Sequence, residues 1–220
     1  MSTSRPITSD EHVEIMKTMS ETHIGIRPNP EIVHILTIEC STGLRLSDIL
    51  AMKLSDFYLT DSGYRLKIRE QKTGKERNVP IPLELHHYIS EYALAKGCRR
   101  DERIFKLTPR AVTKYIKKVA DYLGLENVSS HSWRKLYALS VYEKTGNDIV
   151  AVQQALLHSS LAVTQRYHNR RSEKLEQVLQ THCNIVDVDV FNLLKQGIDM
   201  FANVTRTQNI SSHIFYKIKI

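Results

Sequence analysis

The sequence has little cysteine and no long apolar run. The 3 cysteines among its 220 residues lie far apart, at Cys40, Cys98 and Cys183, and none belongs to a C-x-x-C pair. This set supports neither a disulfide framework nor a structural zinc site. No run of about 18 apolar residues occurs, so no helix is expected to span a membrane. The N-terminus lacks the apolar stretch of a secretory signal, which predicts an intracellular protein without a membrane partner.

Basic residues are in excess. The chain has 31 Lys plus Arg against 24 Asp plus Glu, a formal net charge of +7 at pH 7. This excess favours a polyanion as partner, although spread over a whole surface it produces only a weak field. Hydrophobic residues make up 41%, which is enough for a packed core in one domain with at most a short appendage.

Hydrophobic periodicity predicts a mixed α+β fold that is mainly α-helical with a small antiparallel β-hairpin or sheet. Alternation from Tyr64 to Glu70 predicts a strand with a basic outer face, and Val79 and Ile81 belong to its return strand after a turn at 72–75. Apolar residues at helical spacing and capping signals then predict helices at about 9–22, from Pro30 to Gly43, 46–54, around 85–97, from Pro109 to Gly124, from Ser129 or Ser130 to Gly146, and from Ile149.

One predicted helix carries an unusual basic face. Arg110, Lys114, Lys117 and Lys118 lie off the apolar stripe of the helix after Pro109, and only Asp121 opposes them. Such a face is either simply solvated or follows the phosphates of a nucleic acid, and the helix alone does not decide between the two.

Four short segments carry chemically active residues, and each is weak evidence alone. They are T-G-L-R-L-S-D ending at Asp48, K-T-G-K at 72–75, H-x-x-R at His131 and Arg134, and H-x8-Y from His158 to Tyr167. Arg45 in the first segment could merely pair with Asp48 or Asp56, Lys72 could be a surface lysine, H-x-x-R recurs at 168–171, and Tyr167 could be a core residue.

The H-x-x-R pair has a physical argument of its own. His131 and Arg134 share one face at the start of a helix, where free N–H groups and the positive end of the helix dipole favour an anion such as phosphate. The same dipole disfavours a charged imidazole, so His131 is expected to stay neutral and able to accept a proton. Taken in order, the four segments match a phosphoryl-transfer site that uses no metal.

The ordered set resembles the tyrosine recombinase, or phage integrase, family over residues 8–177. The resemblance implies the catalytic-domain fold of that family for residues 1–177, and a C-terminal tail at 178–220 that is a candidate protomer-exchange helix. It implies a site-specific DNA recombinase of the integrase or invertase type that cleaves and rejoins DNA through a 3′-phosphotyrosine intermediate. The expected partners are double-stranded DNA, a homotetramer assembled on it, and accessory DNA-bending proteins, in the cytoplasm with the nucleoid. No metal and no cofactor are expected.

The resemblance also implies roles in proton transfer. Tyr167 is the implied nucleophile, Lys72 would protonate the leaving 5′-oxygen, and His131 would act as base near the Tyr167 hydroxyl. A tyrosine with a pKa near 10 is a poor nucleophile at neutral pH, so it needs a neutral histidine and positive charge nearby.

The remaining implied roles concern the phosphate. Arg45 and Arg134 would hold its non-bridging oxygens and stabilise the charge of the transition state, and His158 would hydrogen-bond the same group. Contacts to the DNA backbone are expected from basic residues of the hairpin and the basic helix: Arg65, Lys67, Lys75, Arg110, Lys114 and Lys117.

Two departures from the family pattern stand out. Leu157 precedes His158 where the family usually has glycine, and the separate N-terminal DNA-binding domain of most members is missing from this sequence. The chain is therefore expected to be either a catalytic-domain fragment or a short member of the family.

Three other functions compete with this interpretation. A sequence-specific DNA-binding regulator without chemistry is one, because residues 149–167 resemble a helix-turn-helix. A type IB topoisomerase shares the chemistry but relaxes supercoils without exchanging partners. A metal-dependent hydrolase using His86, His87 and His158 is the weakest, because the spacing of these residues matches no metal motif.

Overall fold

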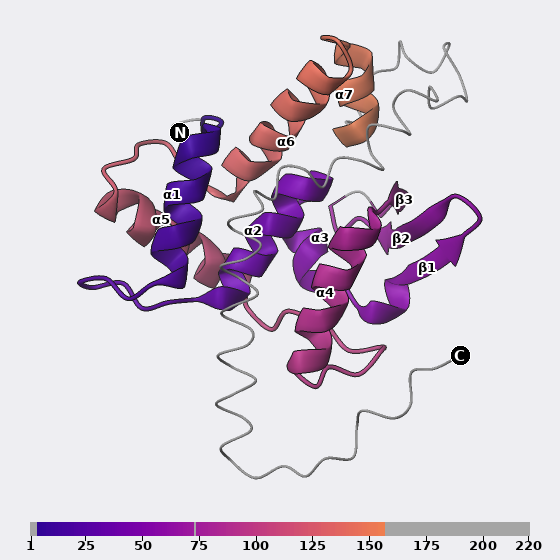
Figure 1. The fold of residues 1–220 in the computed structure, drawn as a ribbon, viewed down its shortest axis with the longest axis horizontal. Coiled ribbons are helices and arrows are strands. Elements are labelled where there is room, and N and C mark those ends of the chain that lie inside the picture. The colour runs from indigo at the N-terminus through magenta and orange to yellow at the C-terminus, as the bar shows by residue number, and fades with distance from the viewer. Residues whose placement is uncertain (1–3, 73, 157–220) are drawn as a thin grey trace.

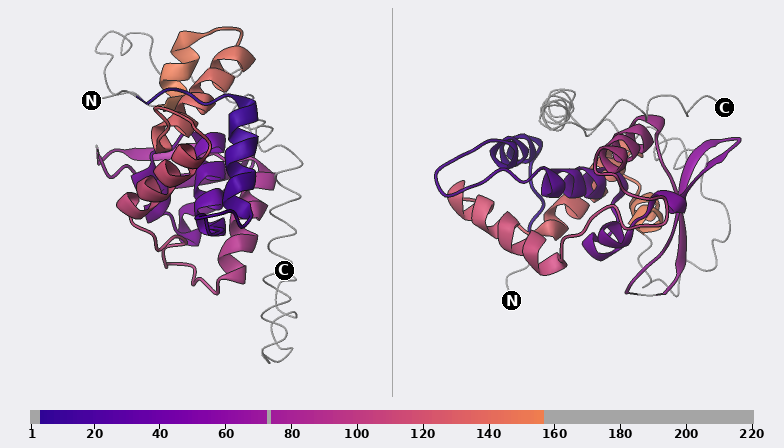
Figure 2. Two further views of the ribbon diagram at one scale, coloured as in Figure 1. Left: turned by 90° about the vertical axis from the view of Figure 1, so that its left-hand side faces the viewer. Right: turned by 90° about the horizontal axis from the view of Figure 1, so that it is seen from below.

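The computed structural model describes residues 4–72 and 74–156, and these form helices around a small sheet (Figure 1). The helices are α1 (Ser9–Ser20), α2 (Pro30–Thr42), α3 (Leu46–Ala51), α4 (Leu83–Ala95), α5 (Pro109–Tyr122), α6 (Ser130–Lys144) and α7 (Ile149–Leu156), with a 3₁₀ turn η1 (Leu54–Asp56). The strands are β1 (Phe57–Thr60), β2 (Gly63–Arg69) and β3 (Glu76–Pro80). The sheet lies at one end of the long axis and α1 and α5 lie at the other (Figures 1 and 2).

The predicted helix starts are confirmed, and each has a local cause. Thr8 forms a capping box with Glu11 at α1, and the Asn29 side chain accepts a hydrogen bond from the Ile32 N–H at α2. Thr108 caps α5 in the same way, with proline in the first turn, and Ser129 caps α6. Side-chain oxygens satisfy N–H groups that a helix leaves free at its start.

Two helices end earlier than predicted. Helix α1 stops at Ser20 instead of 22, because the chain turns back and His23 pairs with Ile26 in an isolated bridge. Helix α3 stops at Ala51 instead of 54, because Lys53 is extended and pairs with Arg103. In both places backbone pairing outside the helix replaces the next helical turn.

The sheet has the order β1-β2-β3 and is antiparallel throughout. The predicted hairpin corresponds to β2 and β3, with Leu66 and Ile68 buried and Lys67 and Arg69 exposed. Strand β1 was not predicted. It has only 4 residues and no alternation of burial, so its own sequence does not indicate a strand. It is a strand because it pairs with β2.

Helix α2 is the centre of the core. Every residue from Ile32 to Thr42 is buried, as its apolar character on all sides predicts. It packs against α1, α3, α4 and α6. A second, smaller apolar cluster joins α6 to α7 and contains Tyr137, Val141, Ala151, Val152, Ala155 and Leu156.

Some predicted elements fall outside the described residues. These are the H-x8-Y segment from His158 to Tyr167 and the tail at 178–220. Within the part that the structure describes, no helix has the length and apolarity needed to traverse a membrane.

Candidate active site

Arg45 follows a tight turn at the end of α2. Gly43 has φ +60° there, and its N–H donates to the Glu39 carbonyl. A Cβ atom at Gly43 would collide with the ring of Tyr137, so only glycine fits between α2 and α6. The chain leaves this turn with Arg45 immediately before α3, and the Arg45 side chain is 17% exposed.

Two carboxylates hold Arg45. Its Nη1 lies 2.8 Å from Glu70 Oε2 and 4.0 Å from Asp48 Oδ2, while the other Asp48 oxygen accepts from the Gln71 N–H at 2.9 Å. The predicted pairing with Asp48 is therefore present, but Glu70 is the nearer partner. Asp56 instead accepts from the Lys53 N–H. Both carboxylates tie Arg45 to the base of the β2–β3 hairpin.

Arg134 is buried in the second turn of α6, where it binds two backbone carbonyls. One guanidinium nitrogen donates to the Gly43 carbonyl and the other to the Leu156 carbonyl, the latter at 2.8 Å. Burial, followed by the charges of Arg77 and Arg45, lowers the Arg134 pKa to about 10. A cation weakened in this way by its neighbours would be stabilised by an incoming anion.

His131 lies near three predicted site residues. Partial burial lowers its pKa, and the positive charges of Arg134, Lys135, Arg45 and Lys72 lower it further. His131 lies in the first turn of α6, where its side chain is only partly covered, and Lys72 is exposed on the hairpin. The structure thus brings His131, Arg134, Arg45 and Lys72 within one electrostatic neighbourhood, in which the positive charges lower the pKa of the imidazole.

The other two predicted catalytic residues, His158 and Tyr167, lie outside the described residues. They follow α7 in the sequence, and Leu156, whose carbonyl Arg134 binds, precedes His158 by two positions.

Sequence reasoning missed two charged residues of this cluster, Glu70 and Arg77. Arg77 lies on β3 opposite Ile68 and donates to the Ala155 carbonyl, with its Nη1 3.7 Å from Glu70 Oε1. The sequence pattern could have located Arg77. Alternate residues of a strand share a face, and Arg77 lies two positions before buried Val79, so a charge on the inward face was predictable.

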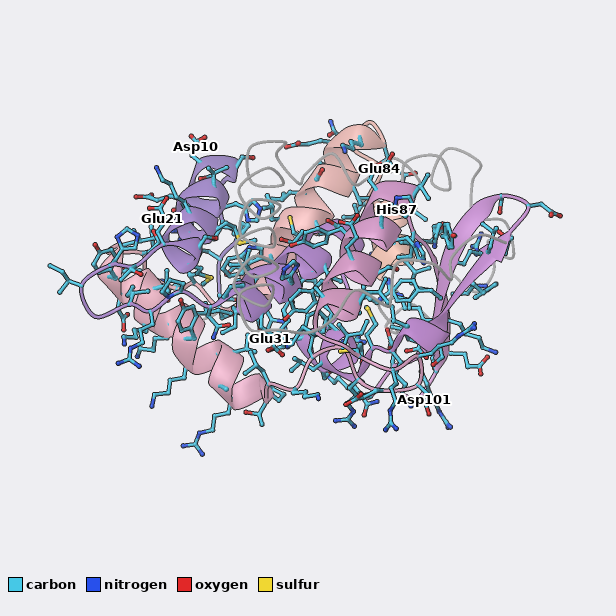
Figure 3. The ribbon with its side chains drawn as sticks, turned by 60° about the horizontal axis from the view of Figure 1, so that its bottom comes forward. Asp10, Glu21, Glu31, Glu84, His87 and Asp101 are labelled. Atoms are coloured by element: carbon cyan, nitrogen blue, oxygen red, sulfur yellow. The ribbon has the colours of Figure 1, made fainter. Side chains whose placement is uncertain are left out.

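The predicted DNA-contact residues form two separate groups. On the hairpin, the Arg65 Nε donates to Asn78 Oδ1 at 3.0 Å and Lys67 pairs with Glu76 at 3.2 Å, while Lys75 is exposed. On α5, the predicted residues Arg110, Lys114 and Lys117 are all exposed. Figure 3 shows long nitrogen-tipped side chains projecting from the outer side of α5, whereas the labelled Asp10 and Glu21 lie along α1.

Two of the histidines of the metal hypothesis have other surroundings. The His86 ring stacks on Tyr64 with centroids 3.7 Å apart, and the rings of His86 and His87 are 6.1 Å apart. Among residues 4–72 and 74–156, no three His, Cys, Asp or Glu side chains gather in a way that could hold a metal ion.

Comparison with known proteins identifies the family. The sequence profile of the phage integrase family matches residues 5–174. The chain belongs to the phage integrase family. Its curated relatives include tyrosine recombinase XerA of Pyrococcus furiosus, 30% identical over 156 residues, which cover 66% of this chain and 52% of that protein. The probable integrase/recombinase YoeC of Bacillus subtilis is 29% identical over 170 residues, 74% of this chain and 88% of that protein.

Solved structures confirm the predicted fold class for this integrase-family chain. The XerH recombinase bound to its difH substrate has a TM-score of 0.56 at 22% identity, covering 81% of this chain and 54% of that one. A λ integrase dimer bound to a COC′ core site has a TM-score of 0.54 at 22% identity, covering 79% and 50%. The chain spans about half the length of several relatives, including XerA and XerH.

Proposed function

We propose that residues 1–177 are the catalytic domain of a site-specific DNA recombinase of the integrase or invertase type. The observation that carries this proposal is the convergence of Arg45 and Arg134 beside His131 and Lys72, in a chain of the phage integrase family. Two guanidinium forks held by protein groups can meet a phosphate without rearranging. The substrate is double-stranded DNA.

The proposed reaction is transesterification at a phosphodiester. The Tyr167 oxygen attacks phosphorus and the bond to the 5′-oxygen breaks, leaving a 3′-phosphotyrosine and a free 5′-hydroxyl. His131 accepts the phenol proton and Lys72 donates a proton to the leaving oxygen. The number of phosphoester bonds is unchanged, so the reverse attack by a 5′-hydroxyl rejoins DNA without ATP.

Arg45, Arg134 and His158 are assigned to the phosphate. The two arginines face the charge that grows on the non-bridging oxygens as phosphorus becomes pentavalent, a stabilisation that a metal ion supplies in other enzymes. The pKa of Arg134, lowered to about 10, supports this role, because a bound phosphate would counter the neighbouring positive charges. The proposal needs no metal and no cofactor.

The tail at 178–220 is assigned to assembly. Phe191, Leu194, Ile198 and Phe201 share one side of a predicted helix that is too short to be stable unless it docks on something. We assign it to exchange between protomers of a homotetramer on DNA, with accessory DNA-bending proteins as further partners in the nucleoid. Deletion after Gln180 should leave binding of one subunit intact and reduce strand exchange, as sedimentation on site-bearing DNA and a recombination assay would show.

The test of the activity is covalent capture of DNA by the full chain. Duplexes with a randomised site and a nick close to it are incubated with the protein. Cleavage releases the short strand between the cut and the nick, which diffuses away and prevents rejoining. Covalent adducts are then separated on a denaturing gel. Tyr167→Phe should abolish the adduct and keep affinity, while a control, Tyr122→Phe at an exposed position on α5, should keep both.

Each alternative has its own outcome in this assay. Binding without any adduct would identify a regulator, and adducts with plasmid relaxation but no exchange between sites would identify a topoisomerase. Loss of adduct in EDTA, restored by magnesium, would favour a metal-dependent enzyme.

A further inference from the structure

We propose that Arg77 is a positioning residue for DNA cleavage, which ties the β2–β3 hairpin and Arg45 to the end of α7. The chain continues from this end to His158 and Tyr167. The inference rests on the proposed function, and it concerns a residue to which no part of the reaction described above assigns a role.

The first argument is burial. The Arg77 side chain is 2% exposed, on the inward face of β3, where Arg77 pairs with buried Ile68 of β2. A guanidinium is almost never buried unless its charge and donors are answered, because desolvation is costly. Arg77 therefore owes its place to specific partners, and two of these, Glu70 and the Ala155 carbonyl, adjoin residues of the candidate active site.

The second argument is its contact with α7. Arg77 donates to the Ala155 carbonyl and Arg134 donates to the next carbonyl, that of Leu156. The last carbonyls of a helix have no partner within the helix and carry its partial negative charge. Two arginines from different elements thus fix the final turn of an eight-residue helix. Only Leu157 separates this turn from His158.

The third argument is the carboxylate that Arg77 shares with Arg45. Glu70 lies 2.8 Å from Arg45 Nη1 through Oε2 and 3.7 Å from Arg77 Nη1 through Oε1. Glu70 also closes the base of the hairpin tip, donating its N–H to the Lys75 carbonyl and accepting from the Gly74 N–H. Arg77 and Glu70 together connect Arg45, the loop that carries Lys72, and the end of α7.

Burial separates Arg77 from Arg45, which is assigned to the phosphate: the Arg77 side chain is 2% exposed, whereas that of Arg45 is 17% exposed. The Arg77 guanidinium is directed at a backbone carbonyl and at Glu70, and it acts on the reaction through them. Lysine keeps the charge but cannot reach both partners with the planar fork of arginine. Arg77→Lys therefore tests the geometry of the Arg77 contacts while the positive charge is kept.

The experiment measures adduct formation on a captured nicked duplex, with a normal phosphate and with an uncharged methylphosphonate at the cut. Arg77→Lys should lower the rate constant at saturating DNA by about 10-fold or more on both substrates, because small misplacements of reacting groups have large effects. Its Kd for DNA should be unchanged. Arg45→Ala, by contrast, should be relieved on the methylphosphonate. The matched control is Arg99→Lys, whose side chain is 85% exposed.

A second readout follows the end of α7 that Arg77 contacts. Amide hydrogen exchange of residues 149–156 should be faster in Arg77→Lys than in the wild type, with exchange in α2 unchanged. If Arg77→Lys does not fold, Glu70→Gln tests the same link, because it keeps the side-chain shape and removes the shared charge. It should also lower the rate constant at unchanged affinity.

The outcomes distinguish this inference from the proposed function. Wild-type rates in both variants, or unchanged exchange in α7, would overturn the role of Arg77 and leave the recombinase proposal standing. Relief of Arg77→Lys on the methylphosphonate would make Arg77 a phosphate contact, which also overturns it. Absence of any adduct with the wild-type chain would overturn both proposals.

Discussion

A buried arginine has five hydrogen-bond donors and a positive charge, and both need partners within the protein. Arg134 meets this demand with backbone carbonyls. It donates to the Gly43 carbonyl, two positions before Arg45, and to the Leu156 carbonyl, two positions before His158. The same side chain that would bind phosphate thus also holds two chain segments in place. Arg45 differs, since it is held by the carboxylates of Glu70 and Asp48 and keeps 17% of its side chain exposed.

This difference leads to a prediction for the two arginines. Arg45→Ala and Arg134→Ala should each slow adduct formation by about 10²-fold or more, because each removes a preorganised charge at the phosphate. Only Arg134→Ala should also lower the free energy of unfolding measurably, since it leaves two buried carbonyls without their donor. Single-turnover cleavage and urea unfolding would check this. Equal unfolding free energies for the two variants would contradict it.

Another prediction concerns His34, which is buried in α2 against Tyr88 and Tyr92. Burial, and then the charge of Lys96, lower its pKa from 6.5 to about 3. Between these pH values the His34 side chain is protonated in the unfolded chain but neutral in the folded chain. The free energy of unfolding should therefore fall as pH falls from about 6.5 towards 3. The loss is up to about 1.4 kcal/mol per pH unit.

The measurement is urea unfolding of the wild type and His34→Phe at several pH values. Phenylalanine preserves a ring against the two tyrosines, whose centroids lie 4.7 and 3.9 Å from that of His34. The variant should show a shallower decline of stability with falling pH, and the control His87→Phe keeps His34 in place. A decline as steep as in the wild type would rule out His34 as its source.

At the scale of elements, the junction of α2 and α6 depends on Gly43. Alanine there is strained by the positive φ and collides with the Tyr137 ring, whereas Gly97 has φ +66° with open space around it. Gly97→Ala should therefore cost about 1–2 kcal/mol of unfolding free energy from backbone strain. Gly43→Ala should cost about 1–3 kcal/mol more, because overpacking is added. Thermal or urea unfolding of both variants would measure the difference, and equal losses would refute the role of Tyr137.

The elements also show what a sequence can predict. Helix starts were predictable because capping is local: Thr8 with Glu11, and Asn29 before Pro30, act within one turn. The hairpin was predictable because alternation is local too. Strand β1 was not, because its four residues show no alternation of burial even though β2 follows after a two-residue turn. The pairing of Arg45 with Glu70 was not predictable either, because the two residues lie far apart in the sequence. Arg45, Lys72, His131 and Arg134 were found together through the order of their motifs, whereas Arg77 belongs to none of them.

At the scale of the whole molecule, the two basic groups lie far apart. The hairpin with Arg65 and Lys67 is at one end of the long axis, and α5 with Lys114 and Lys117 is at the other (Figure 1). A duplex contacted by both would have to run along the molecule past the candidate active site. Both groups are expected to contact phosphates, because contacts from Lys and Arg to the backbone position a protein on the duplex.

This arrangement gives a prediction for salt dependence. Lys114→Gln should weaken binding to all DNA sequences alike and flatten the slope of log Kobs against log salt by about 0.9, one released counterion. Thr113→Gln, a neutral change at an adjacent exposed position of α5, should leave the slope unchanged. Fluorescence anisotropy at several salt concentrations would show this. A change confined to one DNA sequence would instead make Lys114 a base contact.

The backbone contacts of Arg77 and Arg134 have a consequence for how this protein can evolve. Every residue offers a carbonyl, so the contacts at positions 155 and 156 do not depend on which side chains stand there, provided that these are small or apolar enough for the core. Substitutions can accumulate in α7 while its end stays in place. The site is thereby shielded from drift in the helix that leads to its nucleophile, and a grafted α7 of unrelated sequence would be a practical starting point for redesign.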